Sequence, residues 1–409
     1  MKTLFIMAWR NIWRNKRRTL ITAASVLFAI FFALMMRSMQ IGTFTNYTNN
    51  IVQAYTGYIQ VHKKGYWHDK DINNCLNLSD TLLSKLEKLN NVTVVVPRLE
   101  SFALASFGVQ TKGVMVIGID PEKENNLTHL SKKLVAGTFI GKNSTGVMVA
   151  QKLAHFLGIK VNDTLVLIGQ GYHGVSAAEK FPVIGILHFP APELDKSMVY
   201  TSLPAAWSFF SAENKITSIS LNLKNKGKIT QTVKEISSSL NSDYYEIMSW
   251  DEMLVEIVQF IKAKSTSGLI FLVILYIIVA FGIFGTVLMM TVERVKEFGI
   301  MIAVGMKRSR LITLFGLEIL YMGLIGIISG ISICIPLIYY FYRFPIRLGG
   351  EMGQISETYG IEPLMCFAFQ PGFFINQALV VIVIVFVAEL YPMKKISQLK
   401  ITEAIKTKI

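Results

Sequence analysis

The sequence has few cysteines and lacks the loop that binds nucleotides in many ATP-using proteins. Three cysteines among 409 residues are too few for a disulfide framework. Cys75 and Cys366 could pair if both lie in an oxidising compartment; otherwise Cys75, Cys334 and Cys366 are separate thiols. No G-x-x-x-x-G-K-[ST] loop occurs, so the chain is not expected to hold ATP in the manner of a P-loop protein.

The sequence also lacks the common signatures of metal and nucleophile chemistry. Its six histidines are scattered, and none forms H-E-x-x-H or an i, i+4 pair for zinc. No G-x-S-x-G nucleophile elbow occurs, and His173 stands in a Gly-rich stretch without a neighbouring partner. We therefore expect no catalytic residue, no metal site and no cofactor bound by this chain, and no enzymatic activity of the chain alone.

Charged residues are scarce and unevenly placed. They make up 17% of the chain, against about 25% in soluble proteins. Four long runs hold almost none of them, and because roughly 20 residues of helix cross the hydrocarbon core, each run can span a bilayer. Glu318 and Glu389 are the charged residues inside the runs; each either acts in the membrane or reaches water or a lysine near the interface. The four runs are Thr19–Met36, Gly268–Val292, Leu311–Tyr342 and Phe373–Leu390.

The basic residues indicate the orientation of these helices. The net charge is +14, and +13 of it falls in residues 1–18, 293–310 and 393–409. Under the positive-inside rule these segments are cytoplasmic, whereas residues 41–266 and 343–372 lie outside. The positive charge is thus expected to set the membrane topology. We expect the chain to contact the lipid bilayer and not to bind nucleic acid. The sequence MRSMQIGTF offers no small-x-small cleavage site, so the first run is expected to remain as an anchor.

The external segment reads as a mixed α/β domain. Short β-branched or apolar runs bounded by Asn, Pro and Gly predict strands, and glycine after a short apolar helix predicts its end. Between two of the strands, GQGYHGVSAAE predicts a hairpin or loop. The expected strands are 92–96, 113–119, 146–150, 164–168, 181–187 and 216–223, and the expected helices are 151–158, 228–240 and 250–264, the last running into the second span.

The predicted fold is therefore an α-helical membrane protein with four transmembrane helices and a large mixed α/β extracytoplasmic domain. At the N-terminus, Phe5, Trp9 and Trp13 can share one face of a helix that lies on the inner leaflet. The predicted parts are that helix (1–18), four spans (19–40, 267–292, 309–342 and 373–392), the external domain (41–266), a cytoplasmic helix (293–308), an external loop (343–372) and a cytoplasmic tail (393–409).

A charged segment, ERVKEFGIMIAVGMKRSR at 293–310, separates two of the most apolar runs. As a helix it places Phe298, Met301 and Ile302 on one face and its carboxylates on another, and Gly305 ends it. Such a helix is connected at each end to a membrane helix. Any force applied to it would therefore be transmitted to both membrane helices. We expect a cytoplasmic partner with a groove to hold the apolar face, whereas a loop that supplied only positive charge would not need that face.

This segment resembles the coupling helix of the FtsX/MacB superfamily of ABC transporter permeases, whose pattern is E-R-x-x-E-[FI]-G-x-x-x-A-x-G-x-x-[KR]. Ile302 occupies a position where the family usually carries arginine or lysine. AWRNIWRNKRRTLIT, VIGIDPEKE, FPVIGIL and YPMKKISQLKITEAIK are similar to further parts of such permeases. The residues that match the coupling pattern are Glu293, Arg294, Glu297, Phe298, Gly299, Ala303, Gly305 and Arg308, followed in the next span by Glu318.

The resemblance implies a MacB-like periplasmic core domain and a pair of permeases, identical or related, bound to two copies of a separate ATPase that carries ATP and Mg²⁺. It implies mechanotransmission across a bacterial inner membrane, with both termini cytoplasmic. TGYIQVHKKGYW looks most like the LolC/LolE branch, which passes lipoproteins to a periplasmic carrier. The surface formed by Phe281, Gly282, Phe284 and Gly285 would accept acyl chains or pack on the second permease.

Two other functions fit the same resemblance. One is a MacB-like exporter of periplasmic peptides or antibiotics, although the usual exporter of that kind carries its ATPase in the same chain. The other is an FtsX-like regulator that switches a cell-wall hydrolase and moves no cargo. About 225 external residues favour the LolC/LolE or MacB kind, since a division-type subunit usually has a smaller external domain.

Overall fold

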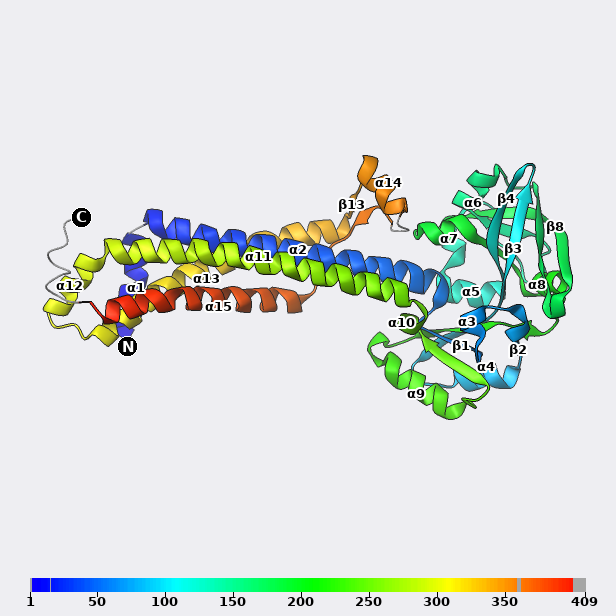
Figure 1. Ribbon diagram of the computed structural model, residues 1–409, viewed down its shortest axis with the longest axis horizontal. Helices are drawn as coiled ribbons and strands as arrows, with labels where there is room; N and C mark the ends of the chain where they lie inside the picture. The colour runs from blue at the N-terminus through cyan, green and yellow to red at the C-terminus, as the bar shows by residue number, and fades with distance from the viewer. Residues whose placement is uncertain (1, 15, 359–361, 400–409) are drawn as a thin grey trace. The chain divides into compact units, whose positions relative to one another are not determined.

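The computed structural model describes residues 2–14, 16–358 and 362–399, which divide into two compact units. Unit 1 comprises Met1–Thr45, Phe260–Arg347 and Leu364–Ile409, and unit 2 comprises Asn46–Gln259 and Leu348–Pro363. Figure 1 labels their helices and strands in chain order. The last part of the predicted closing motif, at residues 400–406, lies outside the described residues.

Unit 1 is built from helices. Within the described residues, four helices are long and apolar enough to cross a membrane. Each extends beyond its apolar run, and α11 begins well before the second run, as the amphipathic sequence there predicts. The helices are α1 (Lys2–Arg14), α2 (Lys16–Ile51), α11 (Val255–Glu293), α12 (Val295–Ala303), α13 (Arg308–Arg343) and α15 (Pro371–Ser397), with a short strand pair β13 (Ile346–Arg347) and β14 (Leu364–Met365).

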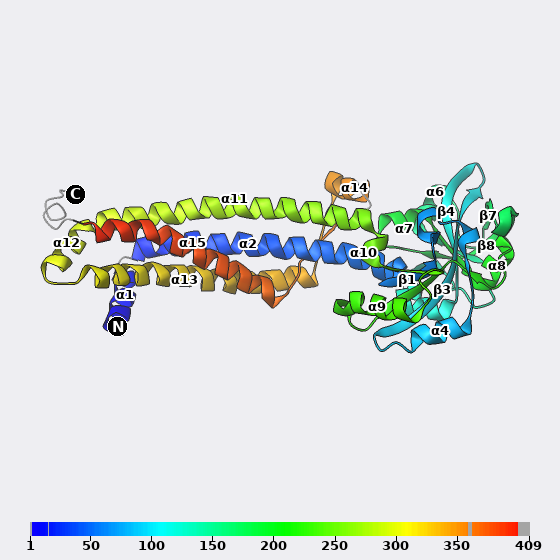
Figure 2. The same cartoon turned by 60° about the horizontal axis from the view of Figure 1, so that its bottom comes forward.

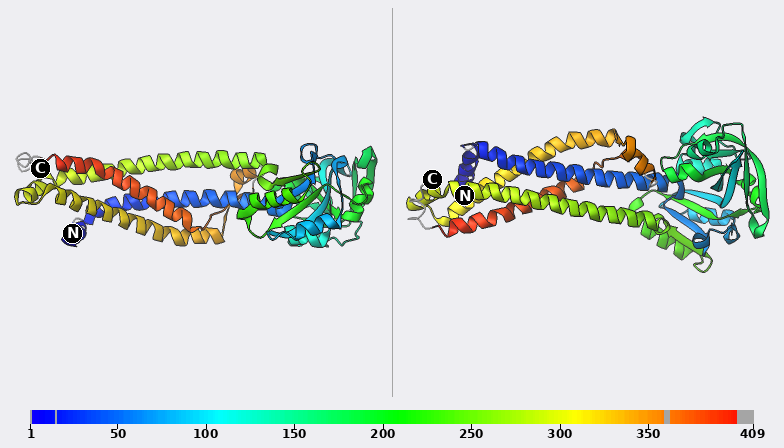
Figure 3. Two further views of the ribbon diagram at one scale, coloured as in Figure 1. Left: turned by 90° about the horizontal axis from the view of Figure 1, so that it is seen from below. Right: turned by 45° about the horizontal axis from the view of Figure 1, so that its top comes forward.

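Glycines let α13 approach its neighbours closely. A Cβ at Gly326 would lie 2.6 Å from the carbonyl oxygen of Ala23, and one at Gly330 would lie 3.0 Å from that of Leu27. Both contacts are to α2, so a Gly-x-x-x-Gly face brings these two backbones together, as small residues do between membrane helices. On α15, Val385 packs beside Gly323 of α13. The pairing of α13 with α15 is visible in Figure 3.

Unit 2 is a mixed α/β domain that contains most of the strands and helices expected in the external segment. Two expectations need correction: the strand expected at 216–223 is divided into Lys215–Ile216 and Ser218–Leu223, which pair in different sheets, and the helix expected at 250–264 is broken at Leu254. Its strands are β1 (Ile59–Lys63), β2 (Leu76–Asn77), β3 (Val92–Phe107), β4 (Gln110–Ile119), β5 (Leu134–Gly137), β6 (Val147–Ala150), β7 (Thr164–Gln170), β8 (Ser176–Leu187), β9 (Met198–Ser202), β10 (Lys215–Ile216), β11 (Ser218–Leu223) and β12 (Tyr245–Ser249). Its helices are α3 (Tyr66–Asp69), α4 (Asp80–Glu87), α5 (Pro121–Thr128), α6 (Gln151–Leu157), α7 (Pro192–Ser197), α8 (Leu203–Phe210), α9 (Ile229–Ser239), α10 (Trp250–Met253) and α14 (Gly350–Thr358), with a π-helix at Val52–Thr56. Cys75, Cys334 and Cys366 are each a buried thiol.

The sheet of unit 2 closes on itself because β3 is long enough to pair with two different strands along the same edge. Its first half pairs with β11, and its second half pairs with β7. The circuit β3-β4-β9-β6-β8-β7 therefore returns to β3, while β11, β1 and β12 continue the sheet beyond it. Figure 2 shows these strands around the core. Closure removes strand edges that would otherwise pair with other chains. The Gly-rich stretch predicted as a hairpin or loop is the β7–β8 hairpin.

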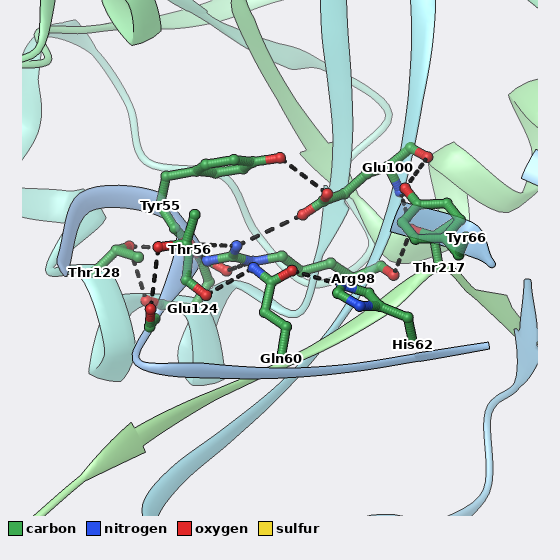
Figure 4. A network of polar contacts seen from close by, with 11 residues as sticks. Tyr55, Thr56, Gln60, His62, Tyr66, Arg98, Glu100, Glu124, Thr128 and Thr217 are labelled. Carbon is green, nitrogen blue, oxygen red and sulfur yellow. Dashed lines mark hydrogen bonds and ion pairs between the residues drawn. The ribbon is translucent and has the colours of Figure 1, made fainter. Parts of the chain in front are cut away.

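A buried network of polar side chains lies where the π-helix meets the sheet (Figure 4). Arg98, 0% exposed, donates from Nε and Nη2 to both oxygens of Glu124 at 2.8 and 2.7 Å. Glu100, 3.6 Å from the Arg98 guanidinium, accepts a hydrogen bond of 2.9 Å from the Tyr55 hydroxyl. Burial of the Tyr55 phenol, and then the charge of Glu100, raise its pKa well above the ordinary value. The phenol therefore stays a donor.

The same network binds the end of the π-helix. Arg98 Nη1 donates to the Tyr55 carbonyl oxygen at 2.5 Å, and Gln60 Nε2 donates to that of Thr56 at 2.7 Å. A helix leaves its last carbonyl groups without intrahelical partners. Here buried side chains supply those partners, so the segment that continues α2 is fastened into the core of unit 2.

We expect Arg98→Met to destabilise unit 2 by about 3–5 kcal/mol, because it leaves the Glu124 and Glu100 carboxylates buried without their cation. Lys180→Met removes an exposed cation of β8 and should change the free energy of unfolding by less than about 0.5 kcal/mol. Urea unfolding of the full chain in mild detergent measures both variants. Equal stability of the two would show that the network does not hold the fold.

A second prediction concerns His62, which is 0% exposed on β1 and bonds Gln60 Oε1 through Nε2 at 2.8 Å. Burial, and then the charge of Lys70, lower the pKa of His62 to about 3. The rings of Tyr66 and Trp67 lie 5.3 and 5.5 Å away. The unfolded chain takes up this proton near pH 6.5, whereas the folded chain does not until about pH 3. Stability is therefore lost as the pH falls through this window, by roughly 1.4 kcal/mol per pH unit.

His62→Gln should reduce that dependence on pH, while His155→Gln, an exposed position on α6, should leave it unchanged. Urea unfolding of the full chain between pH 7 and pH 4, followed by tryptophan fluorescence, gives the slopes. If the free energy of unfolding changed with pH in the same way in the wild type and in His62→Gln, buried neutral His62 would not be the source of the pH dependence.

Candidate functional site

The segment between the second and third apolar runs contains the predicted helix, but its bounds are narrower than the predicted 293–308. Helix α11 ends at Glu293, and α12 begins at Val295. Arg294 between them has φ −101° and ψ 5°, so it forms a corner outside helical geometry. After α12, Gly305 takes φ +104°, a conformation that favours glycine, and α13 starts at Arg308. The expected end of the helix at Gly305 is confirmed.

A buried ion pair holds this corner. Arg294 and Glu318 are 5% and 3% exposed, and Arg294 Nη1 pairs with Glu318 Oε2. The second carboxylate oxygen accepts a hydrogen bond of 2.6 Å from Asn11 Nδ2 on α1. Burial of two charges is costly unless the remaining donors and acceptors are also satisfied. The pair and its third partner thus join α1, the α11–α12 corner and α13.

Further charges surround this pair at the surface. Arg294 Nε donates to Glu297 Oε2 at 3.1 Å, and Arg14 Nη2 lies 3.3 Å from the same oxygen. Arg18, near the start of α2, pairs with Glu293 at the end of α11. Exposed pairs contribute roughly 0–1 kcal/mol each. These pairs connect the basic N-terminal segment to Glu293 and Glu297.

The predicted partner-binding face of α12 needs a correction. Phe298 is 2% exposed and packs against Phe315 of α13, with ring centroids 5.6 Å apart. It therefore contacts its own chain and is not free to enter a groove on another protein. The side chains that face outward are Lys296, Ile300 and Ala303, spaced i, i+4 and i+7, followed by Val304, which is 84% exposed.

Two other residues of the predicted partner-binding segment make contacts within this chain. Gly299 is buried. The Arg308 guanidinium donates to the carbonyl oxygens of Ser397 and Leu399 at 2.9 Å each, just after the last turns of α15. A cation at a helix C-terminus satisfies unpaired carbonyls and the helix dipole. Arg308 thus ties the start of α13 to the end of α15.

The predicted acyl-chain or dimer surface on α11 is mostly open. Phe281 is 71% exposed, and Gly282 and Gly285 are also exposed. Phe284 is half-buried and packs against Tyr391 of α15, with centroids 5.5 Å apart, so it belongs to the helix bundle. Glu389, the other carboxylate within the apolar runs, is buried beside Gly316 of α13.

Asn11, Arg14 and Arg18 belong to the site although their sequence pattern did not mark them as its members. The basic N-terminal pattern predicted a helix at the membrane surface, and the structure confirms helix α1. The partners of these residues lie 275–307 positions away along the chain. No spacing rule connects such distant positions, so only the fold identifies Glu297, Glu318 and Glu293 as their partners.

Comparison with known proteins agrees with this architecture. The model of the FtsX-like permease C-terminal region matches residues 269–401, and that of the MacB-like periplasmic core domain matches residues 19–239. The chain is 21% identical over 247 residues to "Lipoprotein-releasing system transmembrane protein LolC" of Xylella fastidiosa, and the match spans 59% of each chain. It is also 21% identical to "Lipoprotein-releasing system transmembrane protein LolE" of Haemophilus influenzae, over 82% of this chain and 83% of the relative.

Among solved structures, the periplasmic region of MacB from Actinobacillus actinomycetemcomitans is 16% identical, with a TM-score of 0.36. That match covers 52% of this chain and 96% of the solved one. The model of the periplasmic core domain covers more than half of the chain, and its range includes the closed sheet of unit 2. This chain therefore belongs to the FtsX/MacB superfamily of ABC transporter permeases, and it is similar to the LolC/LolE branch of that superfamily.

Proposed function

We propose that this chain is the permease subunit of an ABC transporter that works by mechanotransmission and extracts lipoproteins from the outer leaflet of the inner membrane. In this proposal a periplasmic carrier receives the cargo, both termini are cytoplasmic, and ATP and Mg²⁺ are held by two copies of a separate ATPase. The observation that carries the proposal is the buried Arg294–Glu318 pair, because it joins the coupling segment to two other helices.

The ATPase would act on the outward side of α12. Lys296, Ile300 and Ala303 form a stripe with a cation at one end and apolar side chains beyond it. Such a stripe suits a shallow groove, where apolar contact supplies affinity and the charge sets register. A displacement of α12 would be passed to α11 through the chain and to α13 and α1 through Arg294, Glu318 and Asn11.

The cargo is proposed from chemistry and similarity together. The relatives named for lipoprotein release align with most of the chain, although the match with LolC covers 59% of that protein's length. An acylated protein needs an apolar surface that faces lipid and can open to it. Phe281, Gly282 and Gly285 present such a surface on α11, and a second permease, identical or related, would share it.

Charge reversal tests the coupling role of the segment. We expect Glu297→Lys and Glu293→Lys to leave membrane insertion and ATP hydrolysis in place while lowering lipoprotein release per ATP by about tenfold, a loss of roughly 1.4 kcal/mol in coupling. Each reversal replaces an attraction to Arg14 or Arg18 by a repulsion. Release to the carrier and ATP hydrolysis are measured together in proteoliposomes that contain the partner ATPase.

Glu351→Lys, on exposed α14, is the matched control and should release cargo like the wild type. Arg18→Glu combined with Glu293→Arg restores the attraction with its sign exchanged, and release should recover if Glu293 acts through α2. Recovery would fail if Glu293 instead contacts the ATPase directly. Normal release in both single reversals would overturn the proposed coupling role.

Co-purification tests the choice of cargo. We expect the chain, extracted from native membranes in mild detergent, to bring with it a small ABC-type ATPase and acylated proteins identified by mass spectrometry. The same ATPase with a cell-wall hydrolase and no lipoprotein would favour an FtsX-like regulatory role. Peptides or antibiotics in place of lipoproteins would favour a MacB-like exporter, and the absence of any ATPase would contradict the transporter model.

A further inference from the structure

Two carboxyl groups are buried among the helices of unit 1, and their surroundings differ. Glu318 is 3% exposed, and its two oxygens accept hydrogen bonds from Arg294 and Asn11. Glu389 of α15 is 4% exposed, and among the residues that the structure describes no donor reaches its Oε1 and no cation pairs with it. A positive charge therefore balances only the first of these carboxyl groups.

Glu389 lies in the stripe of α15 that packs against α13. The residue one turn earlier, Val385, packs beside Gly323, and Glu389 continues the stripe beside Gly316. Its carboxyl carbon is 3.4 Å from the position that a Cβ of Gly316 would occupy, and Oε1 is closer still. The terminal methyl group of Met393 lies against the same position, at 2.8 Å. The missing side chain at Gly316 thus makes room for the carboxyl group between the two helices.

The other titratable side chains of the neighbouring segments are exposed or have partners of their own. On α15, the ring of Tyr391 packs against Phe284 of α11. The exposed cations are Lys296, Lys307, Arg310, Lys394 and Lys395. The groups with partners are Arg308 (carbonyl oxygens of Ser397 and Leu399), Tyr321 (ring of Trp9), Glu318 (Arg294 and Asn11), Glu293 (Arg18) and Glu297 (Arg14 and Arg294). Within the described ranges, no positive charge is left to balance an anion at Glu389.

We propose that Glu389 is a proton-binding site, where a neutral carboxylic acid forms part of the contact between α13 and α15. A buried anion without a partner is far less stable than a neutral carboxyl group at the same place. The proton therefore acts as a ligand that keeps the two spans together. A movement that separated them would expose the acid to water and release the proton, and re-forming the contact would take one up. This inference depends on the membrane location of α15 and not on the choice of cargo.

Infrared spectroscopy of the purified full chain detects the proton. A protonated carboxyl group has a carbonyl stretching band that a carboxylate lacks, and a maltoside detergent adds no ester band to that region. We expect the spectrum of the wild type at pH 7, minus that of Glu389→Gln, to contain the band of a protonated carboxyl group. The same subtraction for Glu318→Gln should contain carboxylate bands alone. Carboxylate bands in the Glu389 subtraction would overturn the proposal.

Thermal stability distinguishes a neutral acid from an anion. Glu318→Gln leaves Arg294 buried without its anion, and it should lower the melting temperature of the full chain in detergent by roughly 4 °C. Glu389→Gln and Glu389→Met remove no charge from a neutral group, so each should shift the melting temperature by less than half as much. Equal losses in the Glu389 and Glu318 variants would show that Glu389 serves as an anion, against the proposal.

An apolar carbodiimide identifies the same group chemically. The acid adds its O–H across one C=N bond: its oxygen bonds to the central carbon and its proton goes to one nitrogen. The acyl group then migrates to the other nitrogen, and no group leaves. In the folded chain we expect the adduct to form roughly tenfold or more faster at Glu389 than at Glu318, because only the acid supplies the proton. The unfolded chain at pH 5 should react alike at both. Equal rates in the folded chain would overturn the proposal.

Discussion

The buried pair of Arg294 and Glu318 is the interaction on which the coupling segment depends. Without it, the corner between α11 and α12 would be a short connection held by exposed charges, which contribute little to stability. With it, the corner is bound to the interior of α13 and, through Asn11, to α1. A buried pair is strongly destabilised when one partner is lost. Loss of either partner is therefore expected to disrupt the arrangement around this corner as a unit.

The second constraint acts in unit 2, where Arg98 holds the last carbonyl groups of the π-helix. Helix α2 begins in unit 1, and its C-terminal residues belong to unit 2. A continuous helix is stiff along its axis, and here its end is fastened by a guanidinium that also bridges two carboxylates of the core. Arg98 thus satisfies a backbone carbonyl that would otherwise lack a partner, whereas Arg294 holds its corner through carboxylates.

The basic residues of the chain differ in the contacts that they make. Positive residues are concentrated in the segments that flank the apolar runs, and a subset of them pairs with Glu293, Glu297 and Glu318. Lys16 and Arg17 have no carboxylate partner among the described residues. The cations near the N-terminus thus differ in the partners that the fold supplies.

The sequence alone determined the elements of this protein, whereas the tertiary structure decided which residues meet. Long apolar runs predict spans because lipid admits helices of that length, and β-branched runs with glycine and proline boundaries predicted the strands of unit 2. A helix in the segment between the second and third apolar runs, and its end near Gly305, also followed from local pattern. The closure of the sheet depends on the two halves of β3 pairing with different strands, and the coupling site depends on Asn11 and Arg14 reaching residues about 280–310 positions away. Periodicity reports which face of a helix is apolar but not what covers it, and for this reason Phe298 was assigned to a partner although it packs on Phe315.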